Sequence, residues 1–341
     1  MTEPVPAHAG VPAAELLAPR VDLPLTAEEA AYVAAARAPN TRRGYASDWR
    51  EFSSWCARHG HTPLPAAPEA LSGYITELAG AGARVGTISR RLSSIRFVHV
   101  MRDLPDPGDA RRVATVWEGI RRTHGAPPVQ ARALMPPDLD DVVDACPATR
   151  TFTTRPAEGD LAGLRDRALL LVGFFSALRR SELAALTVAD VADHPRGRVL
   201  SIPRSKTNPY GTEPELVVLP HTARAARCPV TALTAWLDAA GITEGPVLRR
   251  VTRGNRVADG PLHPESVNAI VQRAVARADI GPGPWSAHSL RAGHVTYAHQ
   301  RGASDRAIAH QTRHRSLATI GTYVRIDDAW EDNSAALLAG L

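Results

Sequence analysis

The tetrapeptide Gly125-Ala126-Pro127-Pro128 is the strongest structural break in this chain. Glycine weakens a helix, and two consecutive prolines cannot continue one, because the ring restricts φ and the nitrogen carries no hydrogen to donate. The chain has 341 residues, a length that suits two or three ordinary domains. We therefore predict a linker over residues 126–132, with one domain before it over 27–125 and a second domain after it.

The part before this break has the hydrophobic periodicity of α-helices. Apolar residues at spacings of four, three and four predict one buried helix face, made of Tyr45, Trp49, Phe52 and Cys56. Further helices are expected up to His124, one of them capped by Thr87. Residues 1–26 are rich in proline and alanine without a clear period, so we expect a flexible arm there.

Arginine pairs recur in this first part of the chain, at positions 42–43, 90–91, 111–112 and 121–122. The formal net charge is +5, and a basic surface of this kind is typical of proteins that bind a polyanion, nucleic acid first. Arginines that simply decorate solvated helix faces are the alternative interpretation. The candidate DNA-binding residues are Arg42, Arg43, Arg50, Arg90, Arg91 and Arg96.

Several classes of protein are disfavoured by the composition. The 3 cysteines are too few and too dispersed for a disulfide framework or a CxxC metal site. The chain lacks the apolar segment of a secretory signal and any run of eighteen apolar residues, so we expect no membrane association. His310 and His314 lie four apart but lack a neighbouring Cys or carboxylate, so neither a metal nor a cofactor is expected. We expect a cytoplasmic protein, associated with the nucleoid when bound to DNA.

The second part of the chain is expected to be mostly helical with a small β-sheet. Strand composition occurs at 199–203 and 216–219, with Lys206 in the connection between them. Lys206 is the only lysine in the chain. Arginine is effectively never deprotonated, whereas a lysine ammonium can give up a proton, so Lys206 is a candidate proton donor. A residue left over from a compositional bias against lysine is the alternative.

A set of polar residues in the second part is suited to a phosphate group. His288 and Arg291 lie three apart, which places both side chains on one face of a helix. Arg179 precedes a short helix, with Glu182 three residues further on. Two neighbouring donors can hold a phosphate or a carboxylate, and arginine can do so with two parallel hydrogen bonds.

Taken in order, these motifs resemble the tyrosine recombinase (phage integrase) family. The resemblance is carried by Arg179-x-x-Glu182-Leu183, a lysine between two strands, His288-x-x-Arg291, and a nine-residue interval from His314 to Tyr323. It covers about residues 133–326. The basic helical domain before them is similar to the SAM-like core-binding domain of that family. The resemblance therefore implies a mainly α, α+β protein: a SAM-like helical bundle plus a mostly helical catalytic domain with a small antiparallel sheet.

The resemblance also implies a mechanism without metal or ATP. Tyr323 would attack phosphorus and form a 3′-phosphotyrosyl link, which stores the energy of the broken bond. Lys206 would protonate the leaving 5′-oxygen. Positive groups would stabilise the charge that develops on the phosphate oxygens. The catalytic residues implied are Arg179, Lys206, His288, Arg291, His314 and Tyr323.

The sequence departs from the family pattern at two positions. The residue before the third-motif histidine is usually glycine but here is Arg313, a bulky charge that either contacts the DNA backbone or alters the loop. Ser176-Ala177 stands where Thr-Gly is common. Among rival nucleophiles, Tyr297 is expected in the core and Tyr210 in a mobile turn. Glu182 is expected to orient an arginine or cap local structure.

The resemblance implies duplex DNA sites as partners, with a dimer on each site and a tetramer in synapsis. Residues 327–341 form a leucine-containing tail that would dock on a neighbouring protomer, and accessory DNA-bending proteins are further partners. A type IB topoisomerase, which shares this chemistry, is the alternative enzyme. A DNA-binding regulator that has lost cleavage is the alternative from another class.

Overall fold

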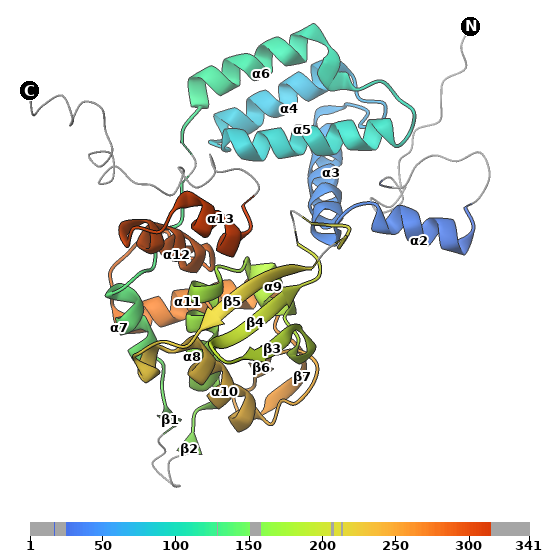
Figure 1. Ribbon diagram of the computed structural model, residues 1–341. Helices are drawn as coiled ribbons and strands as arrows, with labels where there is room; N and C mark the ends of the chain where they lie inside the picture. The colour runs from blue at the N-terminus through green and yellow to red at the C-terminus, as the bar shows by residue number, and fades with distance from the viewer. Residues whose placement is uncertain are drawn as a thin grey trace, which may run out of the picture. The chain divides into compact units, whose positions relative to one another are not determined.

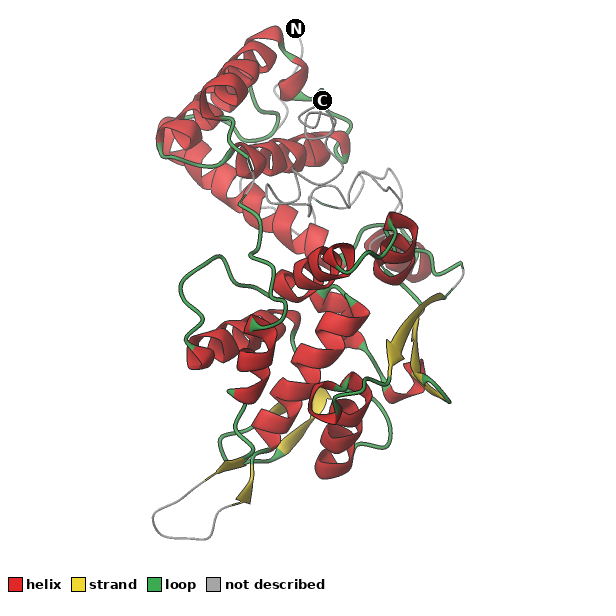
Figure 2. Ribbon diagram, turned by 60° about the vertical axis from the view of Figure 1, so that its left-hand side comes forward, coloured by secondary structure: helices red, strands yellow, loops and turns green. Residues whose placement is uncertain are grey.

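The structure is a computed structural model. It describes Leu17 and residues 25–127, 129–150, 158–205, 208–212 and 214–314. The chain divides into two compact units at Pro128 and Val129. Each unit has its own hydrophobic core. Among the described residues, every strand belongs to the second unit, and helices make up most of the rest (Figure 2). No helix in the described part of the chain is long and apolar enough to cross a membrane.

The first unit is a helical bundle (Figure 1). Its elements are α2 (Ala27–Ala35), α3 (Pro39–His59), α4 (Pro68–Gly80), α5 (Val85–Val100), the 3₁₀ helix η1 (Pro107–Asp109) and α6 (Arg111–His124). Trp49, Phe52 and Cys56 are buried on one face of α3, which confirms the predicted core stripe. Tyr45 is only partly buried and packs at the edge of that core.

Two local details of this unit differ from the sequence expectation. The helix expected to start at Thr87 begins at Val85, with Arg84 as the residue before it and no side-chain cap. Thr87 therefore lies in the first turn of α5, where its backbone N–H donates to the carbonyl of Arg84. Helix α2, which was not predicted, buries no residue. Thr26 and Glu29 satisfy its first backbone donors through a capping box instead.

His99 links α5 to the loop before α4 through hydrogen bonds that require a neutral ring. It is fully buried on α5. Its Nε2 accepts a hydrogen bond from the backbone N–H of Ala66 at 3.0 Å, and its Nδ1 donates to the carbonyl of Ile95 at 2.8 Å. A protonated ring would carry a hydrogen on Nε2 and could not accept from Ala66. Burial lowers the pKa of His99, although the Ile95 carbonyl opposes the shift.

The first unit should therefore lose stability as the pH falls. The folded unit holds His99 neutral below the unfolded pKa of about 6.5, so the unfolded state binds more protons and is favoured by up to about 1.4 kcal/mol per pH unit below that value. Amide hydrogen exchange of α5 peptides in the full chain, corrected for intrinsic rates, should show less protection at pH 5.5 than at pH 7.5. In His99→Gln, which does not titrate, this pH dependence should disappear. If His99→Gln lost as much protection between pH 7.5 and pH 5.5 as the wild type, His99 would not be the source of the pH dependence.

The second unit combines seven described α-helices with small antiparallel sheets. Strands β3 (Val191–His194), β4 (Gly197–Ile202) and β5 (Glu215–Pro220) form a three-stranded sheet in the order β3-β4-β5. Two pairs of short strands stand apart from it: β1 (Thr149–Arg150) with β2 (Glu158–Gly159), and β6 (Arg249–Val251) with β7 (Val257–Pro261). The helices are α7 (Asp138–Asp144), α8 (Leu161–Ser176), α9 (Arg180–Ala185), α10 (Pro229–Ala240), α11 (Pro264–Ala278), α12 (His288–Gln300) and α13 (Asp305–Thr312).

Helix α8 is the central element of this unit. It is capped by Asp160, whose side chain accepts from the N–H of Gly163, and most of its residues are buried. It packs against α10, α11, α12 and β5 (Figure 1). The C-terminal end of α8 therefore lies at the meeting point of the sheet and the later helices, just before Arg179 in the sequence.

Three helices of this unit end in a left-handed residue that is not glycine, and two of these ends, those of α8 and α13, lie at the arginine cluster. Ala177 ends α8 with φ +50°, and Arg313 ends α13 with φ +57°. A residue with a Cβ is disfavoured in this region by about 1–2 kcal/mol, which is why glycine is the usual residue at such helix ends. These are the two positions at which the sequence departs from the family's glycines. Each departure therefore falls where the backbone itself favours glycine.

Candidate active site

Arg179 is positioned by the carboxylate of Glu182. It immediately precedes α9, and its backbone N–H donates to Glu182 Oε2 at 2.9 Å. Its Nη1 donates to Glu182 Oε1 at 2.8 Å. Glu182 thus holds both the backbone and the guanidinium of the same residue, which confirms the expectation that it orients an arginine. The Arg179 side chain is 22% exposed, so it remains open to a ligand.

Arg291 links the ends of two helices. It lies on α12 and is 2% exposed. Its Nη1 donates to the carbonyl of Ala177 at 2.6 Å, at the end of α8. Its Nη2 donates to the carbonyl of Thr312 at 2.7 Å, at the end of α13. Helix C-termini present unpaired carbonyls and partial negative charge, so a guanidinium there is favourable.

His314 contacts Arg291 and is held as a neutral ring. Its Nε2 lies 2.9 Å from Arg291 Nη2, which has only hydrogens to offer, so Nε2 must be the acceptor. Its Nδ1 then carries the hydrogen and donates to Thr312 Oγ1 at 2.8 Å, while that hydroxyl donates to the carbonyl of Ile308. Burial and the charges of Arg291 and Arg179 lower the pKa of His314 to about 4. At neutral pH it therefore orients Arg291 and adds no charge.

His288 lies on the same side of the site as the two arginines. It begins α12, one turn before Arg291, and its side chain is accessible. Partial desolvation and the charges of Arg291 and Arg179 lower its pKa. The same two guanidinium groups act on His314. The structure thus brings together four of the predicted catalytic residues: Arg179, His288, Arg291 and His314.

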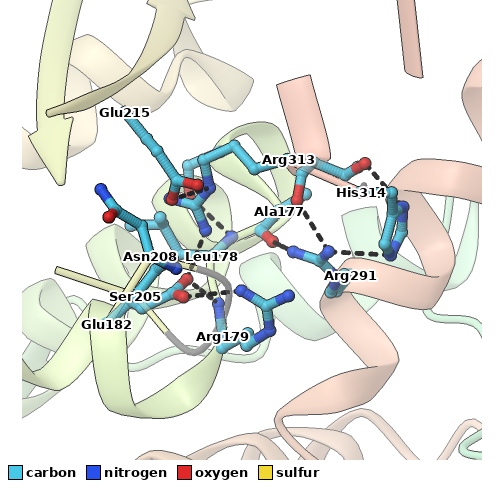
Figure 3. Close-up of polar contacts among 12 residues, drawn as sticks. Ala177, Leu178, Arg179, Glu182, Ser205, Asn208, Glu215, Arg291, Arg313 and His314 are labelled. Carbon is cyan, nitrogen blue, oxygen red and sulfur yellow. Dashed lines mark hydrogen bonds and ion pairs between the residues drawn. The ribbon is translucent and has the colours of Figure 1, made fainter. Parts of the chain in front are cut away.

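Arg313 points into this cluster and away from solvent. Its side chain is 5% exposed and pairs through Nη2 with Glu182 Oε2 (Figure 3). Its Nε lies 3.6 Å from Glu215 Oε2 on β5. Burial by itself would raise the pKa of Glu182, but the charge of Arg313 and the hydrogen bonds from Arg179 together lower it. Of the two expectations for Arg313, a contact with the DNA backbone does not fit this inward orientation.

The hairpin that carries Lys206 is closed tightly on both sides of that residue. Ser205 and Asn208 exchange two backbone hydrogen bonds, of 3.1 Å and 3.2 Å, and both are buried. Both belong to the same group of polar contacts as Arg179, Glu182 and Glu215 (Figure 3). Lys206 itself lies outside the described residues, as do Tyr323 and the tail 327–341.

The candidate DNA-binding arginines of the first unit differ in their surroundings. Arg91 is largely buried, with an ion pair to Glu51 and a hydrogen bond to Tyr74. Arg90 pairs with the buried Asp48, and Arg96 pairs with Asp106. These three arginines therefore hold parts of the bundle together. To bind a phosphate, each of these arginines would have to give up its carboxylate partner or hold the phosphate in addition to it.

The remaining candidates lie on α3. Arg42 donates to the carbonyl of Ala34, and the exposed Arg43 pairs with Asn40. Arg50 is exposed and makes no ion pair among the described residues. A groove along α3 contains it, lined by Ser47, Arg50, Glu51, Ser54 and Arg58. These residues follow one another at spacings of one to four residues, which places their side chains on one face of the helix. Arg58 is a second cation on this face, and it was not among the candidates chosen from the sequence.

The site contains cationic donors but lacks a cluster of metal ligands in the part of the chain that the structure describes. No group of three or more His, Cys, Asp or Glu side chains there could hold a metal ion. The two guanidinium groups can instead donate hydrogen bonds to the oxygens of a phosphodiester. Such preorganised donors act most strongly where charge develops in a transition state.

Comparison with known proteins agrees with this geometry. Residues 149–329 match the model of the phage integrase family, and residues 30–101 match its N-terminal SAM-like domain. The chain is 34% identical over 307 residues to an integrase/recombinase XerD homolog of Selenomonas ruminantium, covering 87% of this chain and 85% of that protein. It is 26% identical over 294 residues to the recombinase Cre of Escherichia phage P1, covering 81% of each.

Solved structures show the same fold. The XerH site-specific recombinase in a post-cleavage complex superposes with a TM-score of 0.61 at 14% identity, covering 92% of this chain and 83% of that one. The Tn1549 transposon integrase gives a TM-score of 0.59 at 13% identity, covering 97% and 99%. The family match and the sequence relatives show that the chain is an enzyme that breaks and rejoins DNA strands. It belongs to the phage integrase family and is a site-specific recombinase of the tyrosine class.

Proposed function

We propose that this recombinase cleaves one DNA strand at a time through attack of Tyr323 on phosphorus. The P–O bond to the 5′-oxygen breaks, a 3′-phosphotyrosyl bond forms, and the 5′-hydroxyl of another strand later reverses the step. ATP is not consumed, because the phosphotyrosyl link retains the energy of the original bond. No metal is required in this proposal, because the arginines supply the positive charge. The observation that supports this most directly is the convergence of Arg179, Arg291 and His314 at the ends of α8 and α13.

In this mechanism the arginines and histidines have different tasks. Arg179 and Arg291 donate to the nonbridging oxygens, where negative charge accumulates in the transition state. The lowered pKa of His314 supports a neutral ring that fixes the plane of the Arg291 guanidinium. His288, also with a lowered pKa, is neutral near pH 7 and can donate to a phosphate oxygen or accept the proton of Tyr323.

Lys206 is proposed as the general acid that protonates the departing 5′-oxygen. The proposal is supported by the two described neighbours of this residue, Ser205 and Asn208, which are buried, bonded to each other and part of the same group of polar contacts as Arg179 (Figure 3). An ammonium brought close to the arginine cluster would have a lowered pKa, because neighbouring positive charges favour its neutral form and make it a better acid. Lys206 is the only lysine in the chain, and arginine, which makes up the rest of the Lys+Arg count, cannot supply a proton at neutral pH.

Lys206→Arg is expected to bind DNA normally but to cleave it about a hundredfold or more slowly, a loss typical of removing a general acid. Single-turnover cleavage of a suicide substrate measures the rate. A 5′-phosphorothiolate substrate provides the matched control, because its sulfur leaves without needing a proton. The sulfur substrate should restore the rate of Lys206→Arg. An equally slow reaction with both substrates would rule out general-acid action.

We further propose that the two units contact duplex DNA, and that protomers pair on a site and form a tetramer in synapsis. Solved relatives include a lambda integrase dimer bound to a core site and a lambda integrase tetramer bound to a Holliday junction. In the first unit, the exposed cations in the α3 groove are the best placed to meet phosphates. Residues 327–341 are proposed to dock on a neighbouring protomer, with DNA-bending proteins as accessory partners.

The proposed function is tested by trapping the covalent intermediate. Purified protein incubated with a nicked suicide site should yield a protein–DNA species that survives denaturation and disappears after protease treatment. Strand exchange between two such sites should follow on substrates that permit religation. Relaxation of any supercoiled plasmid without site preference would favour a type IB topoisomerase, and DNA binding without any adduct would favour a regulator that has lost cleavage.

A further inference from the structure

Arg313 occupies a backbone position that suits glycine, yet it carries a long charged side chain into the protein interior. It has φ +57° at the end of α13, a conformation that disfavours any residue with a Cβ. Its side chain is 5% exposed. A buried guanidinium is costly unless carboxylates compensate its charge. Both features call for a specific interaction at this position.

The contacts of Arg313 join three elements of the active site. One carboxylate partner, Glu182, lies on α9 with its side chain 4% exposed. The other, Glu215, is the first residue of β5 and lies 3.6 Å from Arg313 Nε. We call these three side chains the Arg313 bridge (Figure 3). A neighbouring residue, Gln311, adds a second link by donating to the carbonyls of Phe175 and Val218 at 2.9 Å and 2.8 Å.

The bridge also determines how much negative charge faces Arg179. Glu182 Oε1 accepts from Arg179 Nη1, whereas Oε2 pairs with Arg313. Two guanidinium groups and two carboxylates therefore balance one another. Without Arg313, the charge of Glu182 would be compensated by Arg179 alone, and the attraction of Arg179 for a phosphate would weaken. β5, which follows the Lys206 turn, would also lose its ion pair to α13.

We propose that Arg313 is a positioning residue for DNA cleavage. It shares the negative charge of Glu182 and Glu215, so that Arg179 keeps its orientation and less of its positive charge is compensated at the scissile phosphate. It also ties the β4–β5 hairpin to the arginine cluster. This inference rests on the catalytic role proposed for Arg179, and it gives the unusual residue before His314 a task inside the site.

The test compares Arg313→Gly with Arg313→Lys in the full-length protein. Glycine suits the left-handed backbone, so that variant should fold, as checked by circular dichroism and thermal unfolding. We expect single-turnover cleavage of a suicide substrate to slow by about tenfold to a hundredfold, the scale of a misplaced catalytic group. Affinity for the same DNA, measured in a Tyr323→Phe background, should change much less than the cleavage rate, because many other contacts contribute to binding. Arg313→Lys retains the charge and should recover most of the rate.

A second variant separates charge compensation from a general loss of packing. Adding Glu215→Gln to Arg313→Gly removes one unbalanced carboxylate and should recover part of the cleavage rate. If Arg313→Gly cleaves at the wild-type rate, or if Glu215→Gln slows it further, the proposed bridge is wrong. A wild-type protein that forms no adduct at all would instead overturn the proposed function, so the two failures are distinguishable.

Discussion

Tyr323→Phe is expected to eliminate the covalent protein–DNA adduct while leaving DNA binding intact. The phenol oxygen is the atom that bonds to phosphorus in the proposed mechanism, and phenylalanine differs from tyrosine only by lacking it. In the proposed mechanism no other group attacks phosphorus, so the loss should be complete, beyond the roughly hundredfold effect of losing an acid or a base. Denaturing gels of suicide-substrate reactions measure the adduct, and filter binding or mobility shifts measure affinity.

Two other tyrosines of the second unit serve as matched controls for this substitution. Tyr210 is 85% exposed and lies two residues beyond Asn208, so it is the more accessible rival nucleophile. Tyr297 lies on α12 with its ring 6.4 Å from that of Phe174, against the core. Tyr210→Phe and Tyr297→Phe should both form the adduct normally. An adduct that survives in Tyr323→Phe and vanishes in Tyr210→Phe would reassign the nucleophile.

Arg291→Lys is expected to have the second largest effect, a loss of cleavage of about a hundredfold to a thousandfold. Lysine keeps the positive charge, but its compact ammonium cannot reproduce a planar fork that reaches the carbonyls of Ala177 and Thr312 and the ring of His314 together. The variant should also be less stable by about 1–3 kcal/mol, because a buried carbonyl that loses its donor pays its full desolvation cost. Single-turnover cleavage and thermal unfolding measure the two effects.

Arg165→Lys is the control for the stability part of that prediction. Arg165 is another buried arginine of the same unit, bonded to Asp166 and to the carbonyl of Arg249. It lies twelve residues before Ala177, about 18 Å along α8 at 1.5 Å per residue. This variant should lose stability and keep its cleavage rate per folded molecule. If the two variants cleave equally well, the guanidinium of Arg291 has no chemical role.

Much of the fold could be predicted because the hydrophobic pattern is strongly periodic. The stripe of Trp49, Phe52 and Cys56 is buried as expected. The strands at 199–203 and 216–219 occur as β4 and β5 within two residues. Helix α2 was missed because it buries nothing and depends on a capping box, a feature that hydrophobic periodicity does not reveal. The start of α5 was misplaced because Thr87 resembles a cap but its side chain makes none.

The candidate site, like the fold, could be predicted from the sequence only in part. The order and spacing of Arg179, His288, Arg291 and His314 are properties of the sequence, and the expected grouping of all four is seen in the structure. The hydrogen-bond and ion-pair partners of these residues could not be predicted from the sequence. Arg313 was expected at the DNA backbone or in an altered loop, but it pairs inward with Glu182. Arg91 was selected as a DNA contact, yet it pairs with Glu51 and Tyr74.

The sequence by itself determined the family and its reaction, and it led to the residues proposed to perform that reaction, because cleaving a phosphodiester demands particular functional groups in a recognisable order. Only the tertiary structure decided which of the many arginines are internal and which are exposed, which nitrogen of His314 carries the hydrogen, and what Arg313 contacts. The reason is physical: a helix period assigns a side chain to a face, but its charge partner lies on another element, brought near only by packing. In an arginine-rich chain, those partners distinguish the cations that build the fold from those proposed to act on DNA.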